Sequence, residues 1–230
     1  TNVSTPNYTF SSSEAGTITY GGSCSSSTTS ATTDNNTITL VSLSDDTYSD
    51  CTITVTDNAS NGVTLNISSF VVDTTAPTVS SVSSSTDNGS YKINDNITVT
   101  VTFNDNVIVD NSSGNPRIQL ETGTNDRYAN YVSGNSTSIL SFLYTVQSGD
   151  NTTDLDYTST SSLSANNGTI QDNATNNANL TLLAPGSSGS LGANKDIVID
   201  TTAPTVSSIY PTDNQSGVSV TDNVSVTFSE

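Results

Sequence analysis

The stretch VVDTTAPTVSS, residues 71–81, returns as VIDTTAPTVSS at residues 198–208, with a single change of Val to Ile. A phrase of this length does not arise twice by chance in one chain, so repeated architecture is the first hypothesis to test. Within the phrase, Pro77 removes a backbone donor and stiffens the chain, and it biases Ala76 toward an extended conformation. We therefore interpret each copy as a short, semi-rigid joint between two folded segments.

Composition limits the classes of protein to which the chain can belong. Of its 230 residues, 31% are hydrophobic and 11% are charged, a polar composition typical of sheets with hydrated surfaces. The net charge of −18 repels phosphate backbones and anionic lipid, which argues against nucleic-acid binding. No apolar run reaches the roughly 18 residues of a membrane span, and residue 1 does not begin a signal peptide. We expect a soluble, mature segment without direct membrane insertion.

The pattern of apolar residues predicts an all-β fold, since period-2 alternation runs through the chain and no helical periodicity is found. In the first segment, strands are expected near 16–20, 36–43, 51–56 and 63–72, and a domain ends near residue 74. The predicted domains are residues 1–74, 75–201 and 202–230, the last being the incomplete start of a third.

In the second segment, NITVTVTF (96–103) places its four apolar residues on one face of a strand, and DNVSVTF (222–228) repeats the pattern after the second joint. Two strands are too few to bury a core without a partner, which indicates a section of a longer tandem array. The remaining strands are expected at PRIQLE, DRYANYV, SILSFLYTV, LDYTS, GTIQD, NLTLL and DIVID.

The two cysteines, Cys24 and Cys51, both point inward if TITYGGSC and CTITVT are strands, because each then shares a face with apolar residues. Two inward cysteines on separate strands suggest a disulfide across a β-sandwich, which in turn implies an oxidising compartment outside the cytoplasm. A pair of buried free thiols is the alternative.

Several segments together carry a resemblance to a known family: DTTAPTV at both joints, LSDDTYSDCTITVTDNASN (43–61), VTFNDNV (101–107), YVSGNSTSILSFLYTVQSGD (131–150) and LGANKDIVIDTTAP (191–204). The chain resembles the bacterial immunoglobulin-like repeats of large surface adhesins and biofilm-associated proteins. The resemblance implies tandem Ig-like β-sandwiches joined by short DTTAP linkers. Tyr48 resembles the tyrosine corner of such sandwiches, although an ordinary strand tyrosine explains it equally well.

Catalysis is not expected. The chain has no His, which removes the commonest general base and most zinc sites. Asp154 and Asp156 are a carboxylate pair of the kind that hydrolyses glycosides, but solvated turns or ion ligands explain adjacent acids on a β-protein more simply. The N-x-S/T sequons, such as those at Asn66 and Asn96, occur about as often as chance predicts in a chain so rich in Asn, Ser and Thr.

The leading hypothesis is a non-enzymatic structural segment of a large secreted or cell-surface protein. Ig-like modules in series would form a calcium-stiffened stalk or filament for adhesion or surface assembly. The expected partners are neighbouring modules of the same chain and, in a filament, identical chains. One alternative is a module that binds glycans or another surface through Tyr128, Tyr131 and Tyr157. Another is an accessory region of a surface enzyme.

Calcium is the predicted cofactor, because clustered carboxylate, amide and carbonyl oxygens at a joint are the ligands that Ca²⁺ prefers. The alternative is that Asp and Asn occupy these positions simply because both residues favour turns. The ligands predicted for the first joint are Asp45, Asp46, Asp73, Asn104, Asp105 and Asp172. Those predicted for the second joint are Asp150, Asp154, Asp200 and Glu230.

Overall fold

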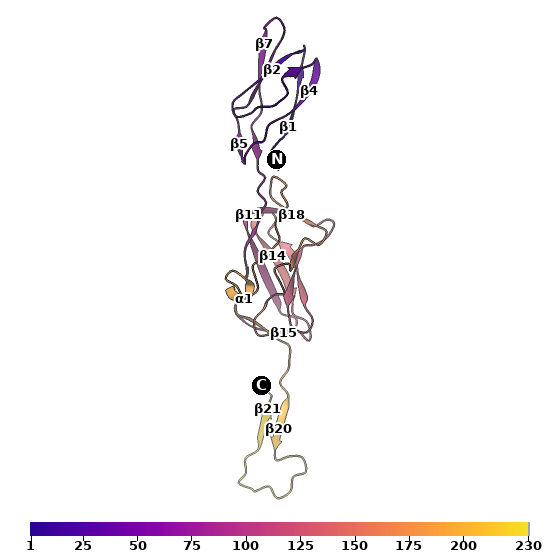
Figure 1. Cartoon of the computed structure of the whole chain (residues 1–230). Helices are drawn as coiled ribbons and strands as arrows, with labels where there is room; N and C mark the ends of the chain where they lie inside the picture. Colours follow the sequence, from indigo (N-terminus) through magenta and orange to yellow (C-terminus); the bar gives the residue numbers. More distant parts are fainter. Residues whose placement is uncertain (230) are drawn as a thin grey trace.

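The computed structural model describes residues 1–229 and consists almost wholly of β-strands, with one short helix, α1 (Leu191–Asn194). Its strands form three bodies in a row (Figure 1), named here the N-terminal unit (residues 1–72), the central unit (residues 79–199) and the C-terminal hairpin (residues 206–228). No helix within residues 1–229 is long and apolar enough to cross a membrane. The predicted all-β class is confirmed.

The N-terminal unit encloses a small core between short sheets. One four-stranded sheet has the order β3-β2-β6-β7, while β1 pairs with β4 and β5 pairs with β8. Ile38 of β4 and Ile53 of β6 meet in this core, and each is only 1% exposed. The strands are β1 (Asn7–Ser12), β2 (Gly16–Gly21), β3 (Ser30–Ala31), β4 (Asp34–Thr39), β5 (Asp46–Tyr48), β6 (Thr52–Thr56), β7 (Gly62–Asn66) and β8 (Phe70–Val72).

Tyr48, at the end of β5, fixes the loop that precedes its strand. Its hydroxyl donates to the backbone carbonyl of Ser44 at 3.0 Å, and its ring stacks on Phe70 with the centroids 5.4 Å apart. A hydrogen bond from the phenol back to the connecting loop is what the tyrosine-corner interpretation predicts.

The disulfide between Cys24 and Cys51 is confirmed, and both residues are buried. Its expected geometry is corrected, because β2 ends at Gly21 and Cys24 lies in the loop that follows. Gly22 permits this turn: its φ is +72°, and a Cβ there would approach the Asp50 carbonyl oxygen to 2.1 Å. The loop then runs beside the end of β4, where Ser25 O accepts from the Val41 N–H. The bridge therefore ties a crossing loop to the start of β6 rather than joining two facing strands.

The central unit is a larger sandwich-like body in which an eight-stranded sheet faces a three-stranded one. The long strand β11 lies in the larger sheet and carries β9, β14 and β18; the smaller sheet has the order β10-β19-β15. The elements are β9 (Val79–Ser84), β10 (Gly89–Tyr91), β11 (Asn96–Asp110), β12 (Arg117–Glu121), β13 (Arg127–Ser133), β14 (Thr137–Thr145), β15 (Asn151–Thr152), β16 (Asp156–Tyr157), β17 (Leu163–Ser164), β18 (Thr169–Gln171) and β19 (Ile197–Asp200), with α1 before β19.

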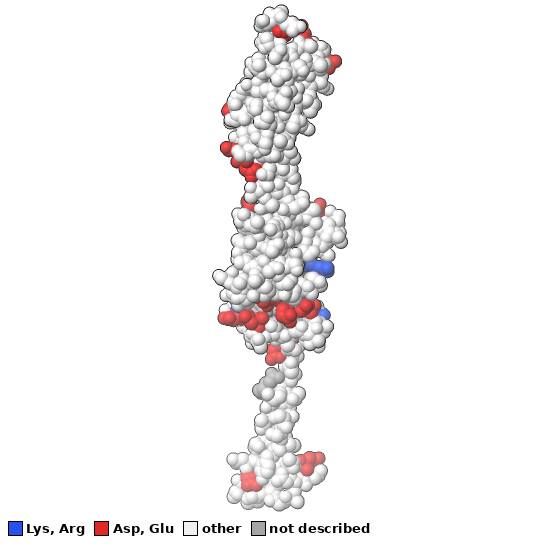
Figure 2. All heavy atoms as spheres, in the orientation of Figure 1, with Lys and Arg blue, Asp and Glu red and all other residues white. Residues whose placement is uncertain are grey.

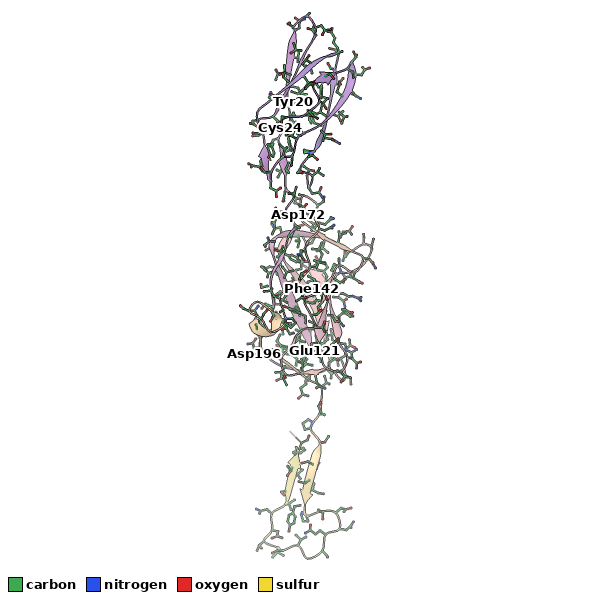
Figure 3. The ribbon with its side chains drawn as sticks, in the orientation of Figure 1. Tyr20, Cys24, Glu121, Phe142, Asp172 and Asp196 are labelled. Atoms are coloured by element: carbon green, nitrogen blue, oxygen red, sulfur yellow. A yellow bond between two sulfur atoms is a disulfide. The ribbon has the colours of Figure 1, made fainter. Side chains whose placement is uncertain are left out.

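The core of the central unit follows the alternation seen in the sequence. The four apolar residues of NITVTVTF are at most 2% exposed, as the shared face predicts. Phe142 of β14 lies among them near the middle of the unit (Figure 3), and Ile197 of β19 closes the core from the smaller sheet. Two strongly apolar faces thus hold the two sheets together.

The C-terminal hairpin, β20 (Val206–Tyr210) and β21 (Ser225–Phe228), repeats the β9–β11 pairing of the central unit. Val206 pairs with Phe228, as Val79 pairs with Phe103, and both ladders contain a register shift beside this pair. In the hairpin, however, Phe228 is 55% exposed, whereas Phe103 is buried. The strand pair that follows each joint is therefore formed in the same way in both copies.

Several expectations about the strands need correction, and the strands that were not predicted include the short β3, β5, β10, β15 and β17. Strand β1 was not predicted, although Tyr8 and Phe10 alternate with polar residues there. The expected strand 63–72 is divided into β7 and β8, which belong to different sheets. NLTLL (179–183) is not a strand; it forms a single bridge, from Asn179 to Thr78, and buries Leu182 as a loop residue.

Candidate functional site

The two DTTAPT segments, residues 73–78 (the first joint) and 200–205 (the second joint), begin with the same local turn. In the first joint, Asp73 Oδ1 accepts the backbone N–H of Thr75 at 3.1 Å; in the second, Asp200 Oδ1 accepts that of Thr202 at 2.9 Å. An Asp that accepts from the N–H two residues on forms an Asx turn, which ends the preceding strand without leaving that donor unpaired.

In the first joint, one side chain of the N-terminal unit holds both threonines. Asp45 lies opposite Asp73, one step beyond the last β5–β8 pair. Its Oδ1 accepts both the N–H and the hydroxyl of Thr74, each at 2.8 Å, and its Oδ2 accepts the hydroxyl of Thr75 at 2.6 Å. These bonds, that of Thr75 first, lower the pKa of the exposed Asp45 carboxyl below its ordinary 3.8.

In the second joint, Asn151 occupies the corresponding place, since it pairs directly with Asp200. Its Oδ1 accepts the N–H of Thr201 at 3.0 Å and lies 3.5 Å from the hydroxyl of Thr202. The Thr201 hydroxyl donates to the backbone carbonyl of Asp150 at 3.0 Å. An amide at Asn151 thus performs for the second joint most of what the Asp45 carboxylate performs for the first.

The last threonine of each joint is held by the body that follows. Thr78 and Asn104 are joined twice: Asn104 Oδ1 accepts the Thr78 N–H at 2.7 Å, and the Asn104 N–H donates to the Thr78 carbonyl at 3.0 Å. Thr205 and Ser229 repeat the arrangement at 3.0 and 2.8 Å, with Ser229 Oγ as the acceptor. Asn104 and Ser229 are the residues that follow VTF in the two copies.

Among residues 1–229, the loop after β18 adds direct contacts to the first joint. Asn176 Nδ2 donates to the Asp73 carbonyl and to Asp172 Oδ2, both at 2.8 Å, and Asn2 Nδ2 reaches the Thr175 carbonyl at 3.3 Å. Asp172 is buried at the end of the central unit that faces this joint (Figure 3). The N-terminal and central units are therefore connected by more than the linker itself.

The proline of each joint reflects the same difference. Pro77 is buried in the first joint, and its carbonyl accepts the N–H of Asn179, whereas Pro204 is exposed in the second. The buried Pro77 and the exposed Pro204 show that, within residues 1–229, the first joint is packed against its neighbours more fully than the second.

At the first joint, the side-chain oxygens of the residues predicted as calcium ligands take part in hydrogen bonds within the protein. The side chains of Asp45, Asp73, Asn104 and Asp172 do lie at or beside the joint, but their oxygens accept N–H or O–H donors. The other two acids are turned to their own backbone: Asp46 accepts the Thr47 N–H, and Asp105 accepts the Asn106 N–H. Within residues 1–229 no three Asp, Glu, His or Cys side chains converge as a metal-binding group. Calcium remains a prediction from the sequence.

At the second joint, Asp150 has a different environment from the one expected of a joint ligand, because its carboxylate is fully buried. Its Oδ1 accepts from Arg127 Nε at 2.8 Å, and its Oδ2 accepts the Tyr144 hydroxyl at 2.6 Å and the Gln147 N–H at 2.9 Å. Burial, and then the bond to Asp150, raise the pKa of Tyr144. This network belongs to the interior of the central unit. Glu230, the last predicted ligand, lies outside the described residues.

A row of acidic side chains, called here the acidic belt, crosses the visible face of the central unit near the end that faces the second joint (Figure 2). Asp154, the remaining predicted ligand, belongs to it and is exposed; partial desolvation, and then the charges of Asp156 and Asp196, raise the pKa of its carboxyl. Glu121 and Asp196 mark the same level in Figure 3. The charges of Asp154, Asp156 and Asp196 therefore repel one another.

The three tyrosines of the ligand-binding alternative do not form an exposed row. Tyr157 is buried, and its hydroxyl donates to the Leu183 carbonyl at 2.8 Å; Tyr131 is half-buried and packs edge-on against Phe142. Only Tyr128 is exposed, and its ring is covered by the Arg117 guanidinium 4.1 Å from the centroid. Tyr157 is therefore not available to contact a ligand at the surface, because its ring fills the core.

Sequence reasoning missed three residues that hold the joints: Asn151, Asn176 and Ser229. The position of Ser229 was visible in the sequence, since it aligns with Asn104 after VTF. Asn151 begins the short strand β15, and its pairing with Asp200 places it at the second joint, whereas Asn176 lies in the Asn-rich loop after β18 and reaches the first joint through its side chain. No motif distinguishes either residue in the sequence.

Comparison with known proteins gives a family match for the C-terminal part of the chain. Residues 200–230 match the family model described as the bacterial Ig-like domain. No curated protein and no solved structure matches the chain. The matched segment starts at the Asp of the second joint and includes the C-terminal hairpin.

Proposed function

We propose that residues 1–230 are a non-enzymatic section of an extracellular stalk or filament, built from tandem Ig-like β-sandwiches that are joined by DTTAP linkers. The observation that carries the proposal is that one arrangement of linker, contacts and strands occurs twice in the chain. The phrase, its contacts with the bodies on both sides and the pairing of the strands that follow it all recur, and the second copy matches the bacterial Ig-like domain. Recurring joints between consecutive modules are the organisation of a linear array.

The shape and chemistry of the chain support a role in spanning distance. The bodies lie end to end, so each added module lengthens the molecule rather than thickening it (Figure 1). The net charge of −18 keeps such an array hydrated and discourages collapse of one module onto another. A disulfide and a bacterial Ig-like segment are both typical of extracellular proteins. Adhesion or surface assembly is the purpose that such a stalk serves in this proposal.

The proposal is tested by locating the protein in the organism that encodes it. Antibodies raised against folded residues 1–229 are applied to intact cells and followed by immunogold electron microscopy. Gold particles outside the envelope and at a distance from it are expected, and the Cys24–Cys51 bridge is expected to be oxidised in protein released from cells by mild proteolysis. Labelling confined to permeabilised cells, with both thiols free, would contradict the proposal.

A further inference from the structure

The two joints are held by the same structural positions but not by the same residue types. On the side of the preceding body, the residue opposite the motif Asp is Asp45 in one joint and Asn151 in the other. On the side of the following body, the residue after VTF is Asn104 in one and Ser229 in the other. An acid is replaced by an amide, and an amide by a hydroxyl. What the four positions share is an oxygen that accepts from the linker backbone.

We propose that these positions form a two-sided hydrogen-bond clamp that fixes each DTTAPT joint without a bound cation. Asp45 and Asn151 act as positioning residues that fasten the two threonines after the motif Asp to the preceding body. Asn104 and Ser229 fasten the last threonine to the following one. The linker then has only Ala and Pro between its two fastened ends, and Pro fixes its own φ and restricts the Ala before it.

A calcium site would require different chemistry at these positions. A calcium ion takes six to eight oxygens at about 2.3–2.6 Å and draws much of its affinity from carboxylate charge. Replacing a carboxylate by the neutral amide of Asn151 discards that charge but preserves the hydrogen bond to the Thr201 N–H. The clamp explains why Asp and Asn are interchangeable at this place, and it explains the threonines, whose hydroxyls donate to Asp45.

This inference rests on the proposed function only in that a stalk benefits from stiff joints; the clamp itself is a property of the linker. The experiment therefore reports the relative orientation of two bodies. Residual dipolar couplings are measured for backbone amides of the whole chain, and the N-terminal unit and the central unit are fitted to separate alignment tensors. Two bodies that move together share one tensor, whereas bodies that move independently do not.

The wild-type chain in EDTA is expected to give one shared tensor for the two units. Asp45→Ala removes the acceptor for three donors and is expected to lose the shared tensor, with the cross-peaks within each unit otherwise unchanged. Asp45→Asn is expected to retain it, because Asn151 shows that an amide serves. Asp46→Ala is the matched control, since this neighbouring exposed acid accepts only the N–H of Thr47.

The double variant Thr74→Val and Thr75→Val provides an independent check, because it removes two hydroxyl donors while keeping the shape of the side chains. It is expected to loosen the joint in the same direction as Asp45→Ala. A shared tensor in both Asp45→Ala and the double valine variant would overturn the clamp. So would a wild-type chain that shares a tensor only after calcium is added, or an Asp45→Asn variant that behaves like Asp45→Ala. If the chain passes this test but the protein is found inside cells, the clamp is supported and the proposed function is contradicted.

Discussion

Asp150 shows how a single acidic residue can have a role opposite to the one its sequence context indicates. It directly precedes Asn151, the residue that pairs with Asp200 of the second joint, and an acid at this place is expected to face solvent or a cation. The structure instead buries it completely and pairs it with Arg127, Tyr144 and Gln147. A buried carboxylate is tolerated only when its oxygens are satisfied, and these three partners satisfy both.

Replacement of Asp150 by Asn is therefore expected to destabilise the central unit by about 2–4 kcal/mol. The charge that balances Arg127 is lost, and the Asn amide presents donors where the carboxylate accepted. Urea unfolding followed through the NMR cross-peaks of the central unit measures the change. Asp154→Asn, in the exposed belt nearby, is the matched control and is expected to change stability by no more than about 0.5 kcal/mol. Equal effects of the two substitutions would show that the buried contacts of the Asp150 carboxylate do not stabilise the central unit.

At the scale of the element, the loop between β2 and β3 is the part of the N-terminal unit that most needs a covalent restraint. It crosses from the four-stranded sheet to the end of β4 and offers few apolar side chains to the core apart from Cys24. The bridge to Cys51 closes a loop with a sequence separation of 27 residues.

The paired substitution Cys24→Ala and Cys51→Ala is expected to lower the stability of the N-terminal unit by about 3–4 kcal/mol, the loop-closure entropy for a loop of this length. The central unit is expected to keep its stability, because it has its own core. Amide hydrogen exchange resolves the two units in a single sample. Faster exchange in both units to the same degree would show that they unfold together and that the separate cores are not independent.

Sequence predicts elements well where apolar alternation is long and poorly where it is short. NITVTVTF identifies β11 and its buried face, because four apolar residues in period 2 have no competing interpretation. Strand β1 has only Tyr8 and Phe10 to mark it, and NLTLL has the composition of a strand but is bridged only at Asn179. Strand pairing decides both cases, and pairing is a long-range property that a local pattern does not contain.

The candidate site was predictable in location but not in chemistry. The repeated phrase marks both joints, and four of the six residues predicted for the first joint do lie at or beside it. The pattern of acids indicated calcium because carboxylates and amides are its usual ligands. The sequence does not show that the threonines of DTT would point their donors at Asp45, since this depends on the register of β5 against β8.

At the scale of the whole molecule, the proposed function requires fixed joints that turn a series of small sandwiches into an extended rod. Each body has its own strands, and the bodies are connected by six-residue segments whose ends are fastened on both sides. The first joint has additional contacts through Asn176 and buries its proline, whereas Pro204 of the second joint is exposed within residues 1–229.

Small-angle X-ray scattering of the chain in EDTA tests this account most directly, because the pair-distance distribution reports the relative placement of all bodies at once. The account predicts a skewed, elongated distribution whose maximum dimension agrees with the end-to-end arrangement in Figure 1 and does not change when calcium replaces the chelator. A compact, symmetric distribution in EDTA would contradict it, as would one that becomes elongated only when calcium is present.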